Sequence, residues 1–248
     1  TMMFRGAVEM EMIGDGRTMV IAGNHDLKFV TYPISERLRK QGRALTNWVA
    51  EVRHSAPRHI QDADWTRGAT LDYITPFREF RMGDMDLAAI MEATGSVTEF
   101  PMVDRDPLPF WTRGRVTLLG DAAHPMYPIG SNGASQAILD ARVLTAAFLR
   151  EGVREAALAA YEAERRPATA AVVAANRANG PEQVMQAVES RAPDGFDDVD
   201  AIISREEREE TARGYKRIAG FDVETLNARP SIVQAAGAAP GAAPGAAP

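Results

Sequence analysis

The chain has 248 residues, of which 45% are hydrophobic and 25% charged, with a formal net charge of -6 and no cysteine. This is the composition of a globular protein long enough to bury a large core, and its acidic balance without a Lys/Arg cluster argues against a nucleic-acid partner. Disulfides, thiolate metal sites and a cysteine nucleophile are excluded, and no apolar run of about 18 residues or basic-then-apolar start predicts a membrane span or a secretory signal, so we expect a cytoplasmic protein.

The first hundred residues indicate β-strands. Residues 8–12 alternate apolar and acidic side chains, as a half-buried strand does, and Gly14-Asp15-Gly16 supplies a turn. The charged residues 36–40 are typical of a solvated turn between strands. A β-meander is therefore predicted from strands at residues 8–12, 18–22 and 28–34, with a further strand at residues 44–52.

Helices dominate the second half. A short helix is predicted after Asp84 and before Gly95, a strand at 97–103, and an irregular proline-containing segment at 104–109. The predicted later helices cover residues 133–149, 155–177, 182–190 and 204–218, with Pro167 bending the second or marking a helix junction.

These elements predict an α+β fold, a mostly antiparallel sheet followed by a helical region. We expect a substrate-binding sheet region at residues 1–103 and a central segment with the long helices at 104–180. C-terminal helices are expected at 181–234 and a flexible Gly/Ala/Pro tail at 235–248.

The most informative segment follows a predicted buried strand at 116–119. That strand runs into Gly120-Asp121, where a carboxylate can accept hydrogen bonds from ligand hydroxyls. Gly130 and Gly133 allow the backbone to approach a flat ligand, and the helix beginning there offers unpaired N–H groups and a favourable dipole for negative charge. The pattern suits a ligand with a polyol and an anionic ring edge. The alternative is that Asp121 only caps a turn and the glycines only shape a loop.

The order of these residues resembles the GD motif of class A FAD-dependent monooxygenases, the p-hydroxybenzoate hydroxylase-like group. The match consists of Gly-Asp-Ala-Ala-His at 120–124, a proline-containing loop, Gly-Ser-Asn-Gly-Ala-Ser-Gln-Ala at 130–137, and Asp-Ala at 140–141. Asn47-Trp48-Val49 and the Tyr-Glu-Ala-Glu-Arg-Arg-Pro sequence at 161–167 are similar to its phenazine- and salicylate-hydroxylase-like branch.

The resemblance implies roles for single residues. Asp121 would hydrogen-bond the ribityl hydroxyls of FAD, and Pro128 would lie beside the isoalloxazine ring in a catalytic position. The backbone N–H groups of Gly133, Ala134 and Ser135 would face the flavin N1–C2=O edge. Ser135 stands where many members have Asn, so only its backbone role carries over.

The resemblance also implies the reaction. NAD(P)H would reduce FAD, O2 would give the flavin C4a-hydroperoxide, and a small aromatic substrate would be hydroxylated. Family members begin with a G-x-G-x-x-G unit, which this sequence does not contain. We therefore expect that unit in a missing N-terminal segment or a partner chain, and we expect this chain alone to retain little FAD and to be inactive.

Two alternatives stay open at this point. One is another flavin reaction, such as halogenation or epoxidation. The other is a non-catalytic fragment that binds a small aromatic compound or a partner protein.

Other candidate residues have simpler interpretations. A metal site at His124 is disfavoured because the sequence offers few further ligands. The remaining histidines are expected on surfaces or in turns: His25, His54 and His59. The methionines near the first strands are expected in the core, or in an apolar substrate pocket with nearby aromatics: Met10, Met12 and Met19, with Tyr32, Trp48, Tyr73 and Phe77.

Overall fold

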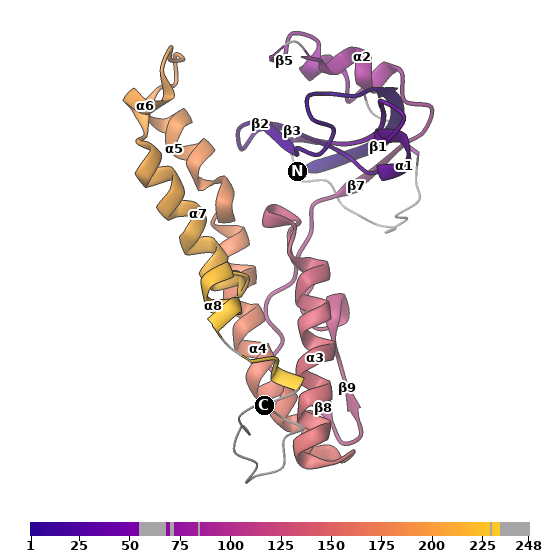
Figure 1. The fold of residues 1–248 in the computed structure, drawn as a ribbon, viewed down its shortest axis with the longest axis vertical. Helices are drawn as coiled ribbons and strands as arrows, with labels where there is room; N and C mark the ends of the chain where they lie inside the picture. The colour runs from indigo at the N-terminus through magenta and orange to yellow at the C-terminus, as the bar shows by residue number, and fades with distance from the viewer. Residues whose placement is uncertain (55–67, 70–71, 84, 229, 234–248) are drawn as a thin grey trace, which may run out of the picture. The chain divides into compact units, whose positions relative to one another are not determined.

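The computed structural model describes residues 1–54, 68–69, 72–83, 85–228 and 230–233. The chain forms two compact units, Thr1–Met102 and Val103–Pro248 (Figure 1). None of the helices in the described residues is both long and apolar enough to cross a membrane. His59, Asp84 and the predicted tail at 235–248 lie outside the described residues.

The first unit is built on one five-stranded antiparallel sheet with the strand order β2-β3-β4-β1-β7. Its strands are β1 (Met2–Glu11), β2 (Val20–Gly23), β3 (Leu27–Pro33), β4 (Arg43–Val52) and β7 (Val97–Pro101). The predicted antiparallel strands are confirmed, but the simple meander is wrong. β2 pairs with β3 as in a meander, but β1 lies between β4 and β7 instead of beside β2, so it joins the sheet through segments distant in sequence.

An aromatic stack fills the core of this unit. Phe29 and Phe77 are fully buried around Trp48, with ring centroids 5.9 Å apart for the Phe29–Trp48 pair. Trp48 also stacks on Tyr73 at 6.1 Å and donates its indole N–H to the Thr94 hydroxyl at 2.9 Å. These rings therefore serve as packed core, and Trp48 and Phe77 have no exposed surface to offer a substrate.

Other predictions for this unit need correction. Residues 36–40 are not a simple turn, because Ser35 caps a short helix, α1 (Glu36–Arg39), that buries Leu38. The helix predicted after Asp84 is α2 (Leu87–Glu92), capped by Asp86.

The methionine expectation holds only in part. Met10 is partly buried against the core, but Met12 and Met19 are 37% and 45% exposed because they flank the turn at the end of β1. His25 is exposed in a turn, as expected.

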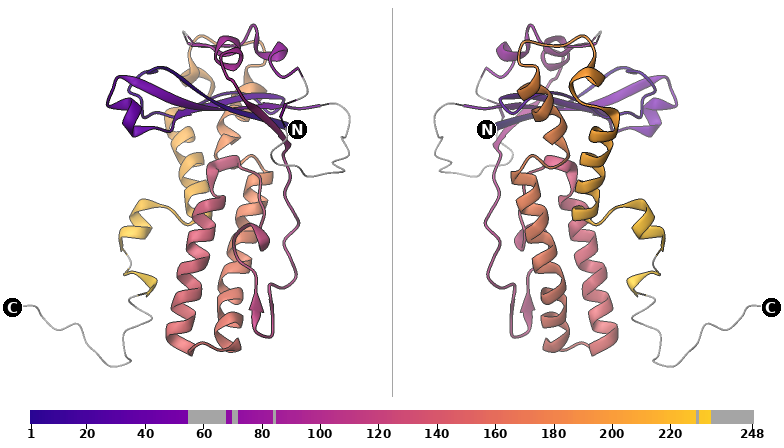
Figure 2. Two further views of the ribbon diagram at one scale, coloured as in Figure 1. Left: turned by 90° about the vertical axis from the view of Figure 1, so that its right-hand side faces the viewer. Right: turned by 90° about the vertical axis from the view of Figure 1, so that its left-hand side faces the viewer.

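A helical hairpin organises the second unit. Helices α3 (Gly133–Glu151) and α4 (Glu155–Arg177) pack side by side, as Figure 2 shows. Both were predicted from their apolar periodicity, and α4 continues through Pro167, so that residue is not a helix junction. The remaining helices are α5 (Gln183–Arg191), α6 (Val199–Ile202), α7 (Arg205–Ala219) and α8 (Val223–Ala228).

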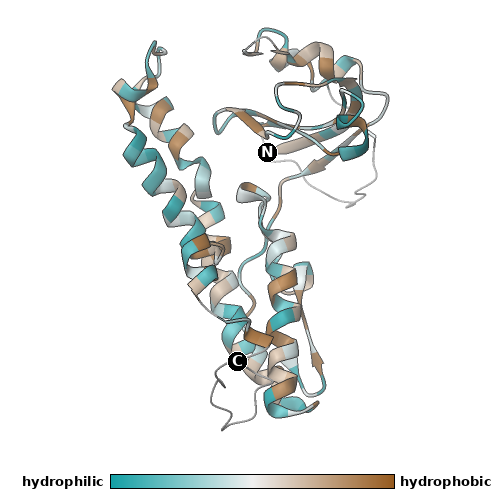
Figure 3. Cartoon of the chain, viewed as in Figure 1, coloured by the Kyte–Doolittle hydropathy of each residue, from teal (hydrophilic) through white to brown (hydrophobic). Residues whose placement is uncertain are grey.

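Charged side chains cover the outer surface of α7, which is drawn mostly in hydrophilic teal in Figure 3. Ion pairs join neighbouring turns, such as Arg205–Glu209 at 2.8 Å, and connect Arg191 on α5 to Glu207 at 2.5 Å. The acidic residues of α7 are thus exposed and paired, while Tyr215 and Ala219 form the buried side of the helix.

The strand predicted at 116–119 is shorter and less buried than expected. It is a two-residue strand, β9 (Val116–Thr117), paired with β8 (Thr112–Arg113). Val116 is 68% and Leu119 43% exposed, because within the described residues only this small hairpin pairs with the strand.

The packing of β1 against Trp48 gives a test of the fold. A Cβ at Gly6 would lie 2.6 Å from Thr94 Cγ2 and 2.8 Å from Trp48 Cζ2. Gly6→Ala should therefore overpack the core and lower the free energy of unfolding by about 1–3 kcal/mol in urea denaturation. Gly95→Ala is the matched control, since nothing lies within 4 Å of its Cβ position. Equal stability of the two variants would contradict this packing.

Candidate functional site

The candidate site lies on the loops that lead into α3. The chain passes from β9 through a 3-10 turn, η2 (Gly120–Ala122), and a second one, η3 (Ile129–Ser131), to the start of the helix. Gly120 and Gly130 have φ values of +59° and +74°, a conformation that glycine adopts without strain. The backbone path thus favours glycine at these two positions of the motif, whereas Gly133 is not among the residues with positive φ.

The structure brings Asp121 to the start of α3. A Cβ placed on Gly133 would lie 3.9 Å from Asp121 Oδ1, so the carboxylate sits beside the first helical residue. The Asp121 side chain is exposed and forms no hydrogen bond within the described part of the chain. The alternative in which Asp121 caps a turn with its side chain is therefore not observed.

The first turn of α3 has no side-chain cap. The N–H groups at the start of a helix lack partners within the helix, so those of Gly133, Ala134 and Ser135 can donate to a ligand. Ala134 and Ser135 are exposed, and Pro128 is exposed on the loop that precedes η3. A carboxylate acceptor and a row of amide donors therefore face solvent close together.

A buried carboxylate holds this arrangement from beneath. Asp140, two turns into α3, is 0% exposed and accepts the backbone N–H of Gly120 at 2.9 Å. Its other partners are His124 Nε2 at 2.6 Å and Arg165 Nε at 2.7 Å, the latter from α4. The single side chain of Asp140 thus ties the Gly120 turn to both long helices.

Charge explains which groups donate to Asp140. Burial raises the pKa of the Asp140 carboxyl, but the hydrogen bonds from His124, Arg165 and Gly120 outweigh burial, and its pKa lies below the usual value. The carboxylate is ionised and can only accept, so His124 donates from Nε2. His124, considered first as a metal ligand, is a structural donor in this network.

The network extends to α7. Arg165 donates from Nη2 to Gln136 Oε1 at 2.6 Å, and Gln136 donates from Nε2 to the carbonyl of Ala219 at 2.8 Å. Arg165 had no assigned role in the sequence, although it stands in the 161–167 motif. Its place in the 161–167 motif was the signal in the sequence, and the burial of Asp140, which makes a charged partner favourable, appears only in the structure.

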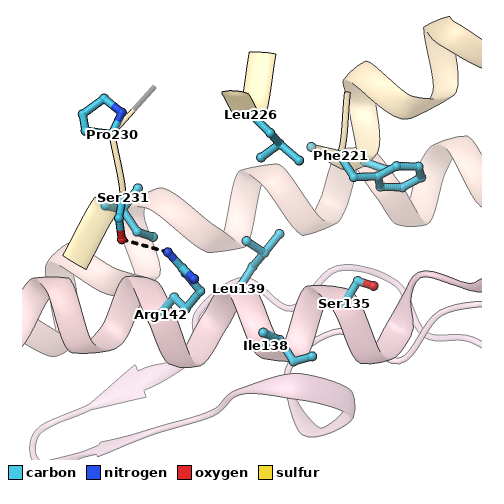
Figure 4. A pocket seen from close by; sticks show the side chains of 11 residues that line it. Ser135, Ile138, Leu139, Arg142, Phe221, Leu226, Pro230 and Ser231 are labelled. Carbon is cyan, nitrogen blue, oxygen red and sulfur yellow. Dashed lines mark hydrogen bonds between the residues drawn. The ribbon is translucent and has the colours of Figure 1, made fainter. Parts of the chain in front are cut away.

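An apolar groove runs along the exposed face of α3 (Figure 4). It has a volume of about 360 Å³ and begins beside Ser135, and Arg142 at its far end donates to the Ser231 hydroxyl at 3.0 Å. Its apolar lining consists mainly of Ile138, Leu139, Phe221, Leu226, Pro230 and Ile232. No sequence pattern indicated this groove, because half of its lining comes from the segment after α7.

Known proteins match this part of the chain. Residues 91–176 match the family model of an FAD binding domain. The chain is 45% identical over 177 residues to the phenazine 1,6-dicarboxylic acid hydroxylase PhzS of Lysobacter antibioticus, covering 71% of the chain and 44% of the relative. It is 49% identical over 79 residues to the 6-hydroxynicotinate 3-monooxygenase of Bordetella bronchiseptica, covering 31% of the chain and 21% of that relative.

Solved structures show the same fold. Klebsiella pneumoniae HpxO, complexed with FAD and uric acid, aligns with a TM-score of 0.57 at 21% identity, over 88% of this chain and 51% of that one. A salicylate hydroxylase substrate complex aligns with a TM-score of 0.57 at 22% identity, over 95% and 56%. The predicted α+β fold and the resemblance to class A FAD-dependent aromatic monooxygenases are confirmed. The chain spans 44% of the length of the Lysobacter relative and 21% of the length of the Bordetella relative.

Removing the buried charge tests the network. Asp140→Asn leaves the Arg165 guanidinium without its anionic partner, and breaking a buried pair in this way should lower the free energy of unfolding by about 3–5 kcal/mol. The loss should shrink at low pH, because a carboxyl with a depressed pKa contributes stability that disappears as pH falls through its folded pKa.

The control for this variant is Asp121→Asn at the exposed carboxylate, which should change stability by no more than about 0.5 kcal/mol. Chemical denaturation of both variants between neutral and acidic pH makes the comparison. A small, pH-independent loss for Asp140→Asn would contradict the ionised network.

Proposed function

We propose that this chain, a relative of the class A FAD-dependent aromatic monooxygenases, supplies the flavin-facing part of an enzyme that uses NAD(P)H and O2 to hydroxylate a small aromatic compound. The observation that carries the proposal is the exposed Asp121 carboxylate beside the uncapped start of α3. The named activities of the relatives support it, since they are a phenazine dicarboxylic acid hydroxylase and a hydroxynicotinate monooxygenase.

The residues present fit FAD in charge and shape. Asp121 is a free acceptor for the hydroxyls of a ribityl chain. The first-turn N–H groups of Gly133, Ala134 and Ser135 are free donors for the N1–C2=O edge. The positive end of the helix dipole favours negative charge at that edge, as a reduced flavin carries. Gly133 has no side chain to separate Asp121 from the ligand.

FAD, when bound, would supply the redox chemistry by which one oxygen atom of O2 enters the substrate and the other leaves as water. NAD(P)H supplies the two electrons. The contribution of this chain is electrostatic and positional: it holds the ring edge with fixed donors that need no rearrangement as charge develops. Pro128, on the same exposed loop, would limit the space beside the ring.

The same resemblance carries two further proposals. The sequence contains no G-x-G-x-x-G, so a separate segment or chain would hold the adenosine part of FAD. The sheet of residues 1–103 is proposed as the substrate-binding region, with Tyr32 a better surface candidate than the buried Trp48 and Phe77. The domain divisions predicted at 180 and 234, and the cytoplasmic location, stay predictions.

Titration of the protein that contains this chain with FAD tests the proposal. Asp121→Ala removes an acceptor and leaves ligand hydroxyls unpaired, which costs about 1.5–3 kcal/mol and should weaken FAD binding about ten- to a hundredfold by flavin fluorescence. Ser135→Ala is the matched control. Ser135 is assigned only a backbone role, so the affinity of this variant for FAD should not change.

Two results would count against the proposal. If the unaltered protein bound no FAD, the assignment of the site would be wrong. If Asp121→Ala bound FAD as tightly as Ser135→Ala, Asp121 would have no part in it.

A further inference from the structure

A buried tyrosine of α7 reaches the loop that carries the candidate site. Tyr215 is 5% exposed, and its hydroxyl accepts a hydrogen bond from Asn132 Nδ2 at 2.5 Å and donates one to Asn176 Oδ1 at 2.7 Å. A phenol has one hydrogen to donate and lone pairs to accept, so both bonds form together. Asn132 immediately precedes α3, and Asn176 lies in the last turn of α4.

The two asparagine partners of this hydroxyl hold the two ends of the segment 127–132. At one end, Asn176 donates from Nδ2 to the carbonyl of Tyr127 at 2.9 Å. Asn132, which donates to the hydroxyl, forms the other end of the segment. Asn132 and Asn176 are 2% and 0% exposed, so neither has water as a substitute partner. Loss of the Tyr215 hydroxyl would leave two buried polar groups unpaired, which proteins strongly avoid.

Close contact reinforces these hydrogen bonds. A Cβ on Gly130 would lie 2.2 Å from the Tyr215 hydroxyl oxygen, and Gly130 has a φ of +74°. On the other side, a Cβ on Gly180 would lie 3.0 Å from Tyr215 Cε2. Because neither glycine has a side chain, the backbone packs directly against the Tyr215 ring at both positions, with no room for a larger residue.

The contact also determines how α3 begins. An Asn at this position usually accepts a backbone N–H of the first turn, but Asn132 makes no such cap. Its αR backbone conformation is not the usual one for a cap, and its Nδ2 donates to Tyr215, which holds the side chain in this orientation. The first-turn N–H groups therefore stay available, which is the property that the proposed ligand requires.

We propose that Tyr215 is a positioning residue of the cofactor site. Through Asn132, Asn176 and the contact with Gly130, it fixes the loop that bears Pro128 and keeps the first turn of α3 open. The identity of the ligand rests on the proposed function; the positioning of the loop does not.

The test begins without any ligand. In the full protein, Tyr215→Phe removes only the hydroxyl oxygen, and amide hydrogen exchange at residues 127–135 should become about tenfold faster, the effect of losing a hydrogen bond worth about 1.4 kcal/mol. Tyr161→Phe is the matched control. Tyr161 is also buried, at 0% exposed, but its hydroxyl donates to the carbonyl of Leu118 at 3.1 Å, and residues 127–135 should exchange at the unaltered rate.

A double substitution separates this contact from general destabilisation. Asn132→Ala should loosen the same residues, and adding it to Tyr215→Phe should have little further effect, because Tyr215→Phe already removes the bond between Asn132 and Tyr215. If Tyr215→Phe does not fold, Asn132→Ala and Asn176→Ala each break a Tyr215 bond and must show the same local loosening.

Ligand binding gives the second readout. Tyr215→Phe should weaken FAD binding several-fold and alter the visible absorption band of the bound flavin relative to the unaltered protein. Exchange that stays at the unaltered rate in Tyr215→Phe, or that rises evenly over the whole unit in both variants, would overturn the positioning role. A loop that loosens as expected in a protein that binds no flavin would support the positioning role and reject the proposed function.

Discussion

The second unit depends on one buried carboxylate. Asp140 has no exposed surface, and a buried charge is tolerated only when donors surround it. Its three donors come from the Gly120 turn, from His124 and from Arg165 on α4. Because two donors lie on the turn at 120–124 and the third on α4, while Asp140 itself lies on α3, satisfying Asp140 fixes the turn relative to both helices.

The exposed part of the site differs from this buried network, because its polar groups lack hydrogen-bond partners in the described residues. Asp121 directly follows the anchored Gly120, yet its own carboxylate has no partner in the described residues, and the start of α3 has no cap. A helix designed only for stability would use Asn132 as a cap, which is worth about 1 kcal/mol. Asn132 makes no such cap, its Nδ2 donates to Tyr215, and the first turn of α3 keeps its donors without a side-chain partner.

Sequence reasoning succeeded where the signal is local. The periodicity of α3 and α4 gave both helices, with α4 at its observed bounds, and the order of residues from Gly120 to Asp140 placed Asp121 near the start of α3. It failed where partners are distant. Tyr215 lies 83 residues beyond Asn132, and nothing in the local pattern at either position marks their hydrogen bond. The pairing of β1 with β4 was missed for the same reason.

The central claim is that the start of α3 and Asp121 together face the flavin. Amide chemical shifts of the isotopically labelled protein, recorded as FAD is added, test it most directly, since each residue reports separately. The account predicts that the largest shifts fall on Asp121 and on Gly133, Ala134 and Ser135, with little change at the buried Asp140. Shifts confined to other parts of the chain, with these four amides unchanged, would contradict it.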